Sequence, residues 1–253
     1  MVILLLCIIG LAVGSFVNVL IDRAPLDESI LWGRSHCDFC KKSLRWFELV
    51  PLFSYISQQG KCRRCHKKLR IQYPLVEVAN AVVFGTVAWF WGPIASVTDI
   101  VGLFAVLFFS SAALSIVVAD VLYQLIPDGA IMLILLSALL RFAITPSSIG
   151  ASVLSGCVAF GIFYFLWWIT RGKGMGFGDV KLAGVLGAFL GFPDIVSALY
   201  IAFLTGAVVG VILMIGKRAG MKTKIAFGPF LIFGTIITLL FSQQIYRLWY
   251  MFV

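Results

Sequence analysis

The chain has 253 residues, of which 61% are hydrophobic and 12% are charged, and its mean hydropathy is +1.05. A soluble domain has about 45–50% apolar and about 25% charged residues, so these values exclude a soluble globular protein, a disordered chain and a disulfide-rich secreted module. A membrane-spanning helix needs about 20 apolar residues, so the chain can hold about eight of them and one small extramembrane module. We therefore predict an all-α polytopic membrane protein.

Eight apolar runs follow one another along the chain, and we interpret each as a membrane-spanning helix. They cover residues 3–21, 75–92, 99–119, 127–144, 149–170, 180–192, 195–216 and 225–246. The first run has no basic stretch before it and no small-residue cleavage site after it, which indicates an uncleaved span. The sixth run is short, so we expect it to be tilted, shielded by neighbours or part of a broken hairpin. The predicted organisation is a first helix over residues 1–21, a loop module over 22–73 and a helical bundle over 74–253.

The loop module contains two C-x2-C pairs, Cys37 with Cys40 and Cys62 with Cys65, separated by 21 residues. Four thiolates with this spacing are typical of a zinc site. Each pair is followed by three residues and then Leu-Arg, which predicts two similar knuckles. A closed shell of four thiolates leaves no open position, so the zinc would be structural and would stabilise a module with few large apolar residues. The alternative, a pair of disulfides, is disfavoured in a reducing cytoplasm.

Two aspartates lie at the ends of apolar runs: Asp120 ends the third run and Asp179 precedes the sixth. Carboxylates at a membrane edge are costly and indicate function. Asp128 has a structural explanation, because Pro127 and an acidic residue both favour the start of a helix. Asp120 has none, since a carboxylate at the C-terminus of a helix opposes the helix dipole. Glu77, just inside the second run, could bind a new amino terminus or pair with a neighbour.

The segment before Asp179 reads RGKGMGFGD and holds four glycines in seven residues. Such a segment cannot form a regular helix, and it lets another backbone approach closely. We expect Gly176 and Gly178 to form a substrate loop, because a protease lays an extended substrate beside its catalytic acid. A nucleotide-binding loop is disfavoured because no strand precedes the glycines and no ribose-binding acid follows them at the right distance.

Basic residues lie almost entirely on one side of the predicted topology. With eight spans, the stretches 22–73, 171–181 and 217–224 fall on one face and contain 18 of the 20 Lys and Arg residues. An excess of Lys and Arg marks the cytoplasmic side of a membrane protein. We therefore expect this face to be cytoplasmic, and we assign the net charge of +9 to topology and contact with anionic membrane lipids, with no nucleic acid as partner.

Together these motifs resemble the type IV prepilin peptidase family. The matching pieces are GFGD at 176–179, the stretch DVLYQLIPD from Asp120, and the loop with two C-x2-C pairs that closes in YPLVE. The opening GSFVNVLIDRAP and the inter-cysteine stretch WFELVPLFSYISQQGKC match as well. The resemblance covers nearly the whole chain. The GxGD motif alone is shared with presenilin-like proteases, but the combination is specific.

The resemblance implies that Asp120 and Asp179 are the catalytic pair. It also implies cleavage of a short basic leader from prepilins and pilin-like proteins, at the cytoplasmic face of the bacterial inner membrane. The cut would fall after a glycine and before the hydrophobic helix of the pilin. Many members of the family also N-methylate the new amino terminus with S-adenosyl-L-methionine, and we assign no residues to this cofactor.

Elementary chemistry agrees with a carboxylate pair. Without a serine or cysteine nucleophile or an open metal, peptide hydrolysis needs an acid and a base around one water. Two carboxylates about 4 Å apart repel by about 4 kcal/mol at an effective dielectric near 20, so near neutral pH they share one proton. The helix dipole favours a charged Asp179 and disfavours a charged Asp120. We predict Asp179 as the resting base and Asp120 as the resting acid.

Three other functions compete with this interpretation. A transporter or channel could use the two aspartates as ion sites, but it would place them near the middle of the membrane and carry a repeated half-structure. A zinc-bearing membrane scaffold leaves the GFGD segment unexplained. A presenilin-like protease leaves the paired cysteines unexplained.

Overall fold

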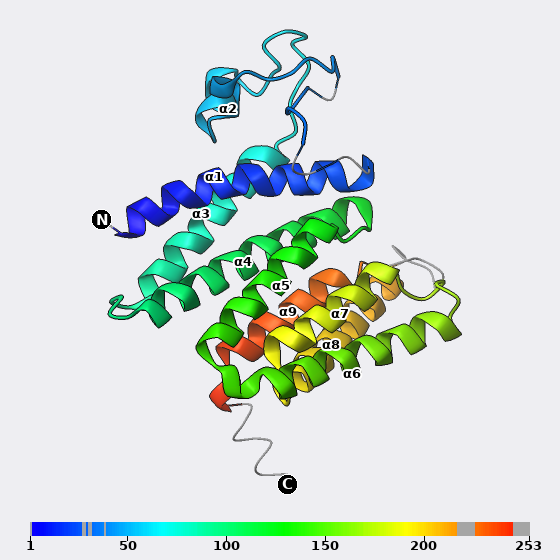
Figure 1. Ribbon diagram of the computed structural model, residues 1–253. Helices are drawn as coiled ribbons and strands as arrows, with labels where there is room; N and C mark the ends of the chain where they lie inside the picture. The colour runs from blue at the N-terminus through cyan, green and yellow to red at the C-terminus, as the bar shows by residue number, and fades with distance from the viewer. Residues whose placement is uncertain (1, 27–28, 30–31, 38, 217–225, 245–253) are drawn as a thin grey trace. The chain divides into compact units, whose positions relative to one another are not determined.

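The computed structural model describes residues 2–26, 29, 32–37, 39–216 and 226–244, and Figure 1 shows its helices. The α-helices are α1 Val2–Arg23, α2 Phe53–Ser57, α3 Gln72–Trp91, α4 Val97–Tyr123, α5 Asp128–Ile144, α6 Ile149–Ile169, α7 Phe177–Leu190, α8 Asp194–Ile215 and α9 Gly228–Leu240. Three short 3-10 helices are η1 Ala24–Leu26, η2 Trp46–Leu49 and η3 Pro146–Ser148. The described residues contain no strand, only two isolated bridges, so the all-α class is confirmed. The predicted basic stretch 217–224 lies outside the described residues.

Each of the eight predicted runs coincides with a helix, and α2 is an additional short helix inside the loop module. Five helices, α1, α3, α4, α6 and α8, are long and apolar enough to cross a membrane. This makes the chain a multi-pass membrane protein. The helices α5, α7 and α9 have 17, 14 and 13 residues. At 1.5 Å per residue they rise about 20–26 Å, less than the roughly 30 Å hydrocarbon core. That these three also cross the membrane stays a prediction.

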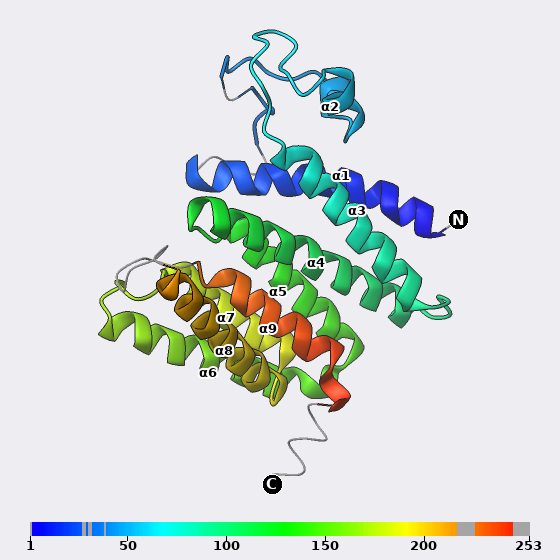
Figure 2. The ribbon, with the colours of Figure 1, turned by 180° about the vertical axis from the view of Figure 1, so that it is seen from behind.

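The chain divides into two compact units, residues 1–115 and 116–253, with the boundary inside α4. In the first unit α1 lies against α3 (Figure 2). Small residues make this contact, because a Cβ added to Gly10 or Gly14 would lie 2.7 Å from a Cα atom of α3. Such close contact through small residues is typical of packed membrane helices. The buried amide of Asn80 also donates a hydrogen bond to the carbonyl of Gly10 over 2.9 Å.

In the second unit α7 is the central helix and contacts α5, α6, α8 and α9. Its side chains Val180, Leu182 and Ala183 are fully buried. The short sixth run is thus shielded by neighbouring helices, which is one of the three alternatives that the sequence left open. This packing fixes the N-terminus of α7, which carries Asp179, inside the helical bundle of the second unit.

Candidate active site and metal centre

Asp120 lies on the last turn of α4 and is buried. Its Oδ2 atom accepts a hydrogen bond from the backbone N–H of Gly228 over 2.8 Å. Gly228 is the first residue of α9, where backbone N–H groups have no partner within their own helix. The carboxyl of Asp120 therefore sits at the C-terminus of one helix and at the N-terminus of another.

Asp179 is the third residue of α7 and is also buried. Its Oδ2 atom accepts the backbone N–H of Gly176 over 3.1 Å. Gly176 precedes the helix, and its carbonyl accepts the N–H of Asp179 in return over 3.2 Å. An acidic side chain that caps its own helix in this way is held in one orientation.

The structure brings the two predicted aspartates together within the second unit, although they are 59 positions apart in the sequence. The carboxyls are close enough for the charge of Asp120 to act on Asp179. Each carboxyl is buried and oriented by one glycine N–H at a helix N-terminus. That the two carboxyls act on one water molecule stays a prediction.

Gly228 is a site residue that the sequence interpretation missed. A Cβ added to it would lie 2.7 Å from Oδ2 of Asp120 and 3.2 Å from a side-chain carbon of Ile116, so only glycine allows this approach. The available signal was the Phe-Gly-Pro-Phe sequence at the start of the eighth run. This sequence does not reveal that Gly228 contacts Asp120, because the two residues are 108 positions apart.

The glycine-rich segment is irregular, as predicted: residues 171–176 form no helix. Of its four glycines only Gly172 has a positive φ, +70°. Gly178 has a different role, because a Cβ there would lie 3.1 Å from Cβ of Ile126 in the connection between α4 and α5. The missing side chain lets this connection approach the start of α7. Whether Gly176 and Gly178 contact a substrate stays a prediction.

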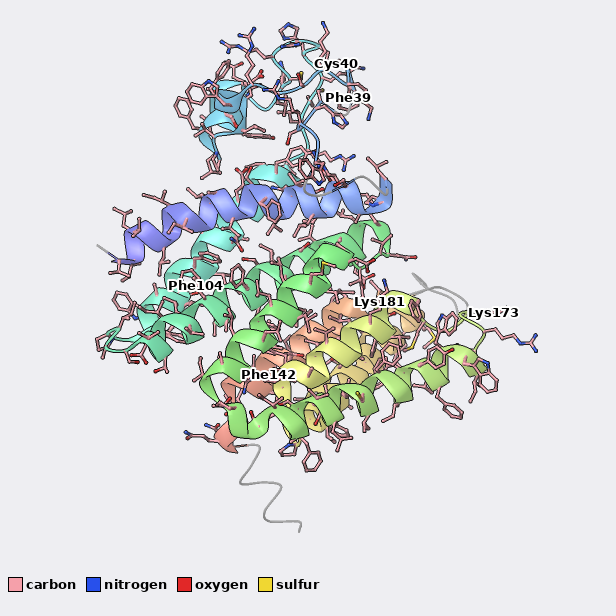
Figure 3. All side chains as sticks on the ribbon, viewed as in Figure 1. Phe39, Cys40, Phe104, Phe142, Lys173 and Lys181 are labelled. Atoms are coloured by element: carbon pink, nitrogen blue, oxygen red, sulfur yellow. The ribbon has the colours of Figure 1, made fainter. Side chains whose placement is uncertain are left out.

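Asp128 begins α5 after Pro127, which confirms the helix start that the sequence indicated. It also makes an ion pair that was not predicted. The Nζ atom of Lys181 lies 2.5 Å from Oδ1 of Asp128 and 5.7 Å from the ring centre of Phe177. Figure 3 labels Lys181 near the start of α7. The pair joins the N-termini of α5 and α7 next to the aspartate site.

Cys37, Cys40, Cys62 and Cys65 form one cluster in the loop module, with all four Sγ atoms within 4.8 Å of one another. The Sγ atoms of Cys37 and Cys65 are 3.8 Å apart. Four thiolates around zinc at about 2.3 Å would be separated by about 3.8 Å. All four cysteines are free of disulfides. The donor set and its spacing therefore fit a tetrahedral zinc ion.

The two cysteine pairs have the same local structure, as the repeated Leu-Arg sequence predicted. In the first knuckle the N–H of Lys41 donates to the carbonyl of Cys37, and in the second the N–H of His66 donates to that of Cys62, both over 2.9 Å. Both donor residues have a positive φ, 54° and 53°. An isolated bridge closes each knuckle, His36 with Ser43 and Lys61 with Lys68.

Glu77 pairs with neighbours within the first unit. It is buried in α3, and its Oε2 atom accepts the backbone N–H of Leu52 over 2.8 Å. The hydroxyl of Ser15 on α1 makes a second hydrogen bond to its carboxyl. Glu77 therefore ties the stretch between the two knuckles to the α1–α3 pair. This favours the second of the two roles that the sequence left open.

A bundle of apolar helices with two interacting aspartates at helix ends defines a polytopic membrane protein of the aspartic peptidase type. Residues 8–91 match the Bacterial Peptidase A24 N-terminal domain, and residues 107–211 match the Type IV leader peptidase family. The chain belongs to the type IV leader peptidase family, as the resemblance implied.

Curated relatives match over almost the full length of the chain. A prepilin leader peptidase/N-methyltransferase of Pseudomonas aeruginosa is 31% identical over 97% of this chain and 92% of its own length. Relatives with the same name in Pseudomonas putida and Bacillus subtilis are 33% and 31% identical, over 94% and 95% of this chain and 90% and 95% of theirs. No solved structure matches the chain. These relatives do not favour a transporter or channel.

Proposed function

We propose that this chain is a membrane aspartic endopeptidase that removes the short leader of type IV prepilins and pilin-like proteins. The observation that carries the proposal is the juxtaposition of the buried carboxyls of Asp120 and Asp179. Family membership supplies the substrate class, and the names of the relatives agree with it. The reaction takes place at the cytoplasmic face of the bacterial inner membrane, the side that carries the predicted excess of Lys and Arg.

In the proposed reaction the two carboxyls hold one water molecule between them. Asp179 takes a proton from the water while the water oxygen bonds to the carbonyl carbon of the scissile peptide. Asp120 gives its own proton to the carbonyl oxygen. The C–N bond then breaks, and the proton on Asp179 passes to the leaving amine. The hydroxyl of the intermediate returns its proton to Asp120, which restores the resting state. The N–H groups of Gly228 and Gly176 orient the two carboxyls throughout.

Gly176 and Gly178 are proposed as the loop along which the substrate lies. Gly178 is one position before Asp179 and Gly176 is three before it, and neither has a side chain that would hold a substrate backbone away from the carboxyl of Asp179. Gly176 is exposed at the N-cap position of α7, so its backbone is accessible from outside the helix. An extended segment of the prepilin would pair with the backbone at this position.

The four cysteines are proposed to hold a structural zinc ion. When bound, zinc supplies the energy that folds the two knuckles, because fifty residues with a small core do not fold alone. The four thiolates fill its coordination shell, so zinc takes no part in hydrolysis. The basic surface of the module is proposed to contact anionic membrane lipids.

A second activity is proposed from the names of the relatives, N-methylation of the amino terminus that cleavage exposes. The methyl donor would be S-adenosyl-L-methionine, as the family resemblance implies. No residue of this chain is assigned to that cofactor.

Reconstitution with a prepilin and labelled S-adenosyl-L-methionine tests both activities. Cleavage is scored by the size of the product and methyl transfer by the label on its amino terminus. The wild-type protein is expected to give a shortened, labelled pilin, and Asp120→Ala is expected to give neither change. A wild-type protein that leaves the prepilin intact would refute the peptidase, and a shortened product without label would remove the methyltransferase.

A further inference from the structure

The stretch between the two knuckles exposes large apolar side chains outside the membrane-spanning helices. We call this set, from η2 to the end of α2, the apolar ridge. Its members and their exposed fractions are Trp46 (79%), Leu49 (40%), Val50 (37%), Phe53 (67%) and Ile56 (71%). Five such residues within eleven positions are unusual on a surface that faces water only.

The ridge belongs to a small folded segment. The helices η2 and α2 contact each other. Phe53 and Ile56 are three positions apart, so they lie on the same side of α2. The intervening Tyr55 is partly buried, and its hydroxyl would lie 3.0 Å from a Cβ on Gly60. The segment is therefore amphipathic, with its bulkiest apolar groups outside.

A hydrogen bond of Glu77 fixes the position of α2 along the helix α3. Glu77 is the sixth residue of α3, a candidate membrane span, so it lies about 8 Å along the helix from its start. It binds the N–H of Leu52, the residue that immediately precedes α2. The beginning of α2 is thus held beside the first turns of a membrane helix. This is the level at which headgroups meet acyl chains.

Two cations of the same module lie beside the ridge. The guanidinium groups of Arg45 and Arg63 lie 6.0 and 5.4 Å from the ring centre of Phe47, next to Trp46. Ten of the module's Lys and Arg residues, all but Arg23, are exposed. Aromatic and aliphatic groups bordered by cations are typical of segments that lie in the interface of an anionic membrane. Both ends of the module also continue directly into membrane helices, α1 and α3.

We infer that the apolar ridge inserts into the anionic lipid interface, so that the segment from Trp46 to Ile56 is a membrane-docking surface of the loop module. Trp46, Phe53 and Ile56 enter the boundary between headgroups and acyl chains, and Arg45 and Arg63 bind lipid phosphates. The hydrogen bond between Glu77 and Leu52 sets how deeply the segment enters the membrane. This inference rests on the proposed membrane placement of the module and not on the proposed peptidase chemistry.

The test places a fluorescent probe on the ridge and a second probe away from it. In a protein with Cys7→Ser and Cys157→Ser and with bound zinc, Ile56→Cys or Lys42→Cys is labelled with bimane. Lys42 is the matched control: it is exposed in the same module and lies two positions after Cys40, which Figure 3 shows apart from α2. Each labelled protein is placed in phosphatidylcholine vesicles with and without phosphatidylglycerol. Quenching is measured with brominated lipid and with aqueous iodide.

The inference predicts at least threefold stronger quenching by brominated lipid at Ile56→Cys than at Lys42→Cys, with the reverse order for iodide. It also predicts that phosphatidylglycerol increases the lipid quenching at Ile56→Cys. Equal access of iodide to both probes would overturn it. A probe at Ile56→Cys that is shielded from iodide but not quenched by brominated lipid would also overturn it, because a protein surface would then cover the ridge. No prepilin is present, so a failed cleavage assay leaves this result unaffected.

Discussion

The backbone N–H of Gly228 donates a hydrogen bond to Oδ2 of Asp120 over 2.8 Å, across 108 positions of the sequence. This contact places the carboxyl of Asp120 at the N-terminus of α9, where the helix dipole favours a negative charge. Asp179 has an equivalent contact with Gly176. The two aspartates are thus oriented by the same kind of backbone group.

Gly228→Ala is expected to lower the rate of leader cleavage at least tenfold, which corresponds to about 1.4 kcal/mol in the barrier. The added Cβ would lie 2.7 Å from Oδ2 of Asp120 and would displace the carboxyl. Gly161→Ala in α6 is the matched control, because a Cβ there meets nothing within 4 Å. Single-turnover cleavage of a prepilin measures both variants. A wild-type rate for Gly228→Ala would contradict the assigned geometry.

The ion pair between Lys181 and Asp128 is expected to matter more for catalysis than for stability. Both side chains are partly exposed, and such pairs contribute about 0–1 kcal/mol to folding. Lys181→Met should lower kcat about three- to tenfold, because the start of α7 carries Asp179. The charge-reversed variant Asp128→Lys/Lys181→Asp should recover part of the loss. If the reversed variant is no better than Lys181→Met, the pair does not position the site.

The four-cysteine cluster predicts one zinc ion per chain. Cys62→Ser removes one of the four ligands and should abolish stoichiometric zinc, whereas Cys157→Ser in α6 should leave it unchanged. Asp120→Asn and Asp179→Asn should both retain zinc, because the aspartates are not ligands. Metal analysis of the purified proteins measures this. Full zinc occupancy in Cys62→Ser would rule out the four-thiolate site.

The resting proton is expected on Asp120, with Asp179 as the charged base. The sequence supported this through the helix dipole, but the contact with Gly228 gives Asp120 a helix N-terminus as well, which weakens the argument from the dipole. The allocation therefore remains a prediction. Infrared difference spectra should lose the protonated carboxyl band in Asp120→Asn and keep it in Asp179→Asn. The opposite pattern would exchange the two roles.

Local sequence patterns predicted the elements and the chemistry-bearing residues. Apolar runs located the helices, because each run had to be shielded from water. Cysteine spacing predicted the four-cysteine cluster, because its members lie in two short segments. The partners of these residues could not be predicted. Three contacts at the site depend on helix packing. They join Gly228 to Asp120, Ile126 to Gly178 and Lys181 to Asp128. Nothing in the local sequence of Leu52 indicated its hydrogen bond to Glu77.

The central claim is that Asp120 and Asp179 act as one unit on one water molecule, and a double-mutant cycle in single-turnover cleavage tests it most directly. Asp120→Asn, Asp179→Asn and the double variant are compared with the wild type after zinc content has shown that each protein is folded. We predict that each single change lowers the rate at least a thousandfold and that the double variant is no slower than either, because residues of one catalytic unit are not additive. A single variant that cleaves at the wild-type rate, or losses that multiply in the double variant, would contradict the account.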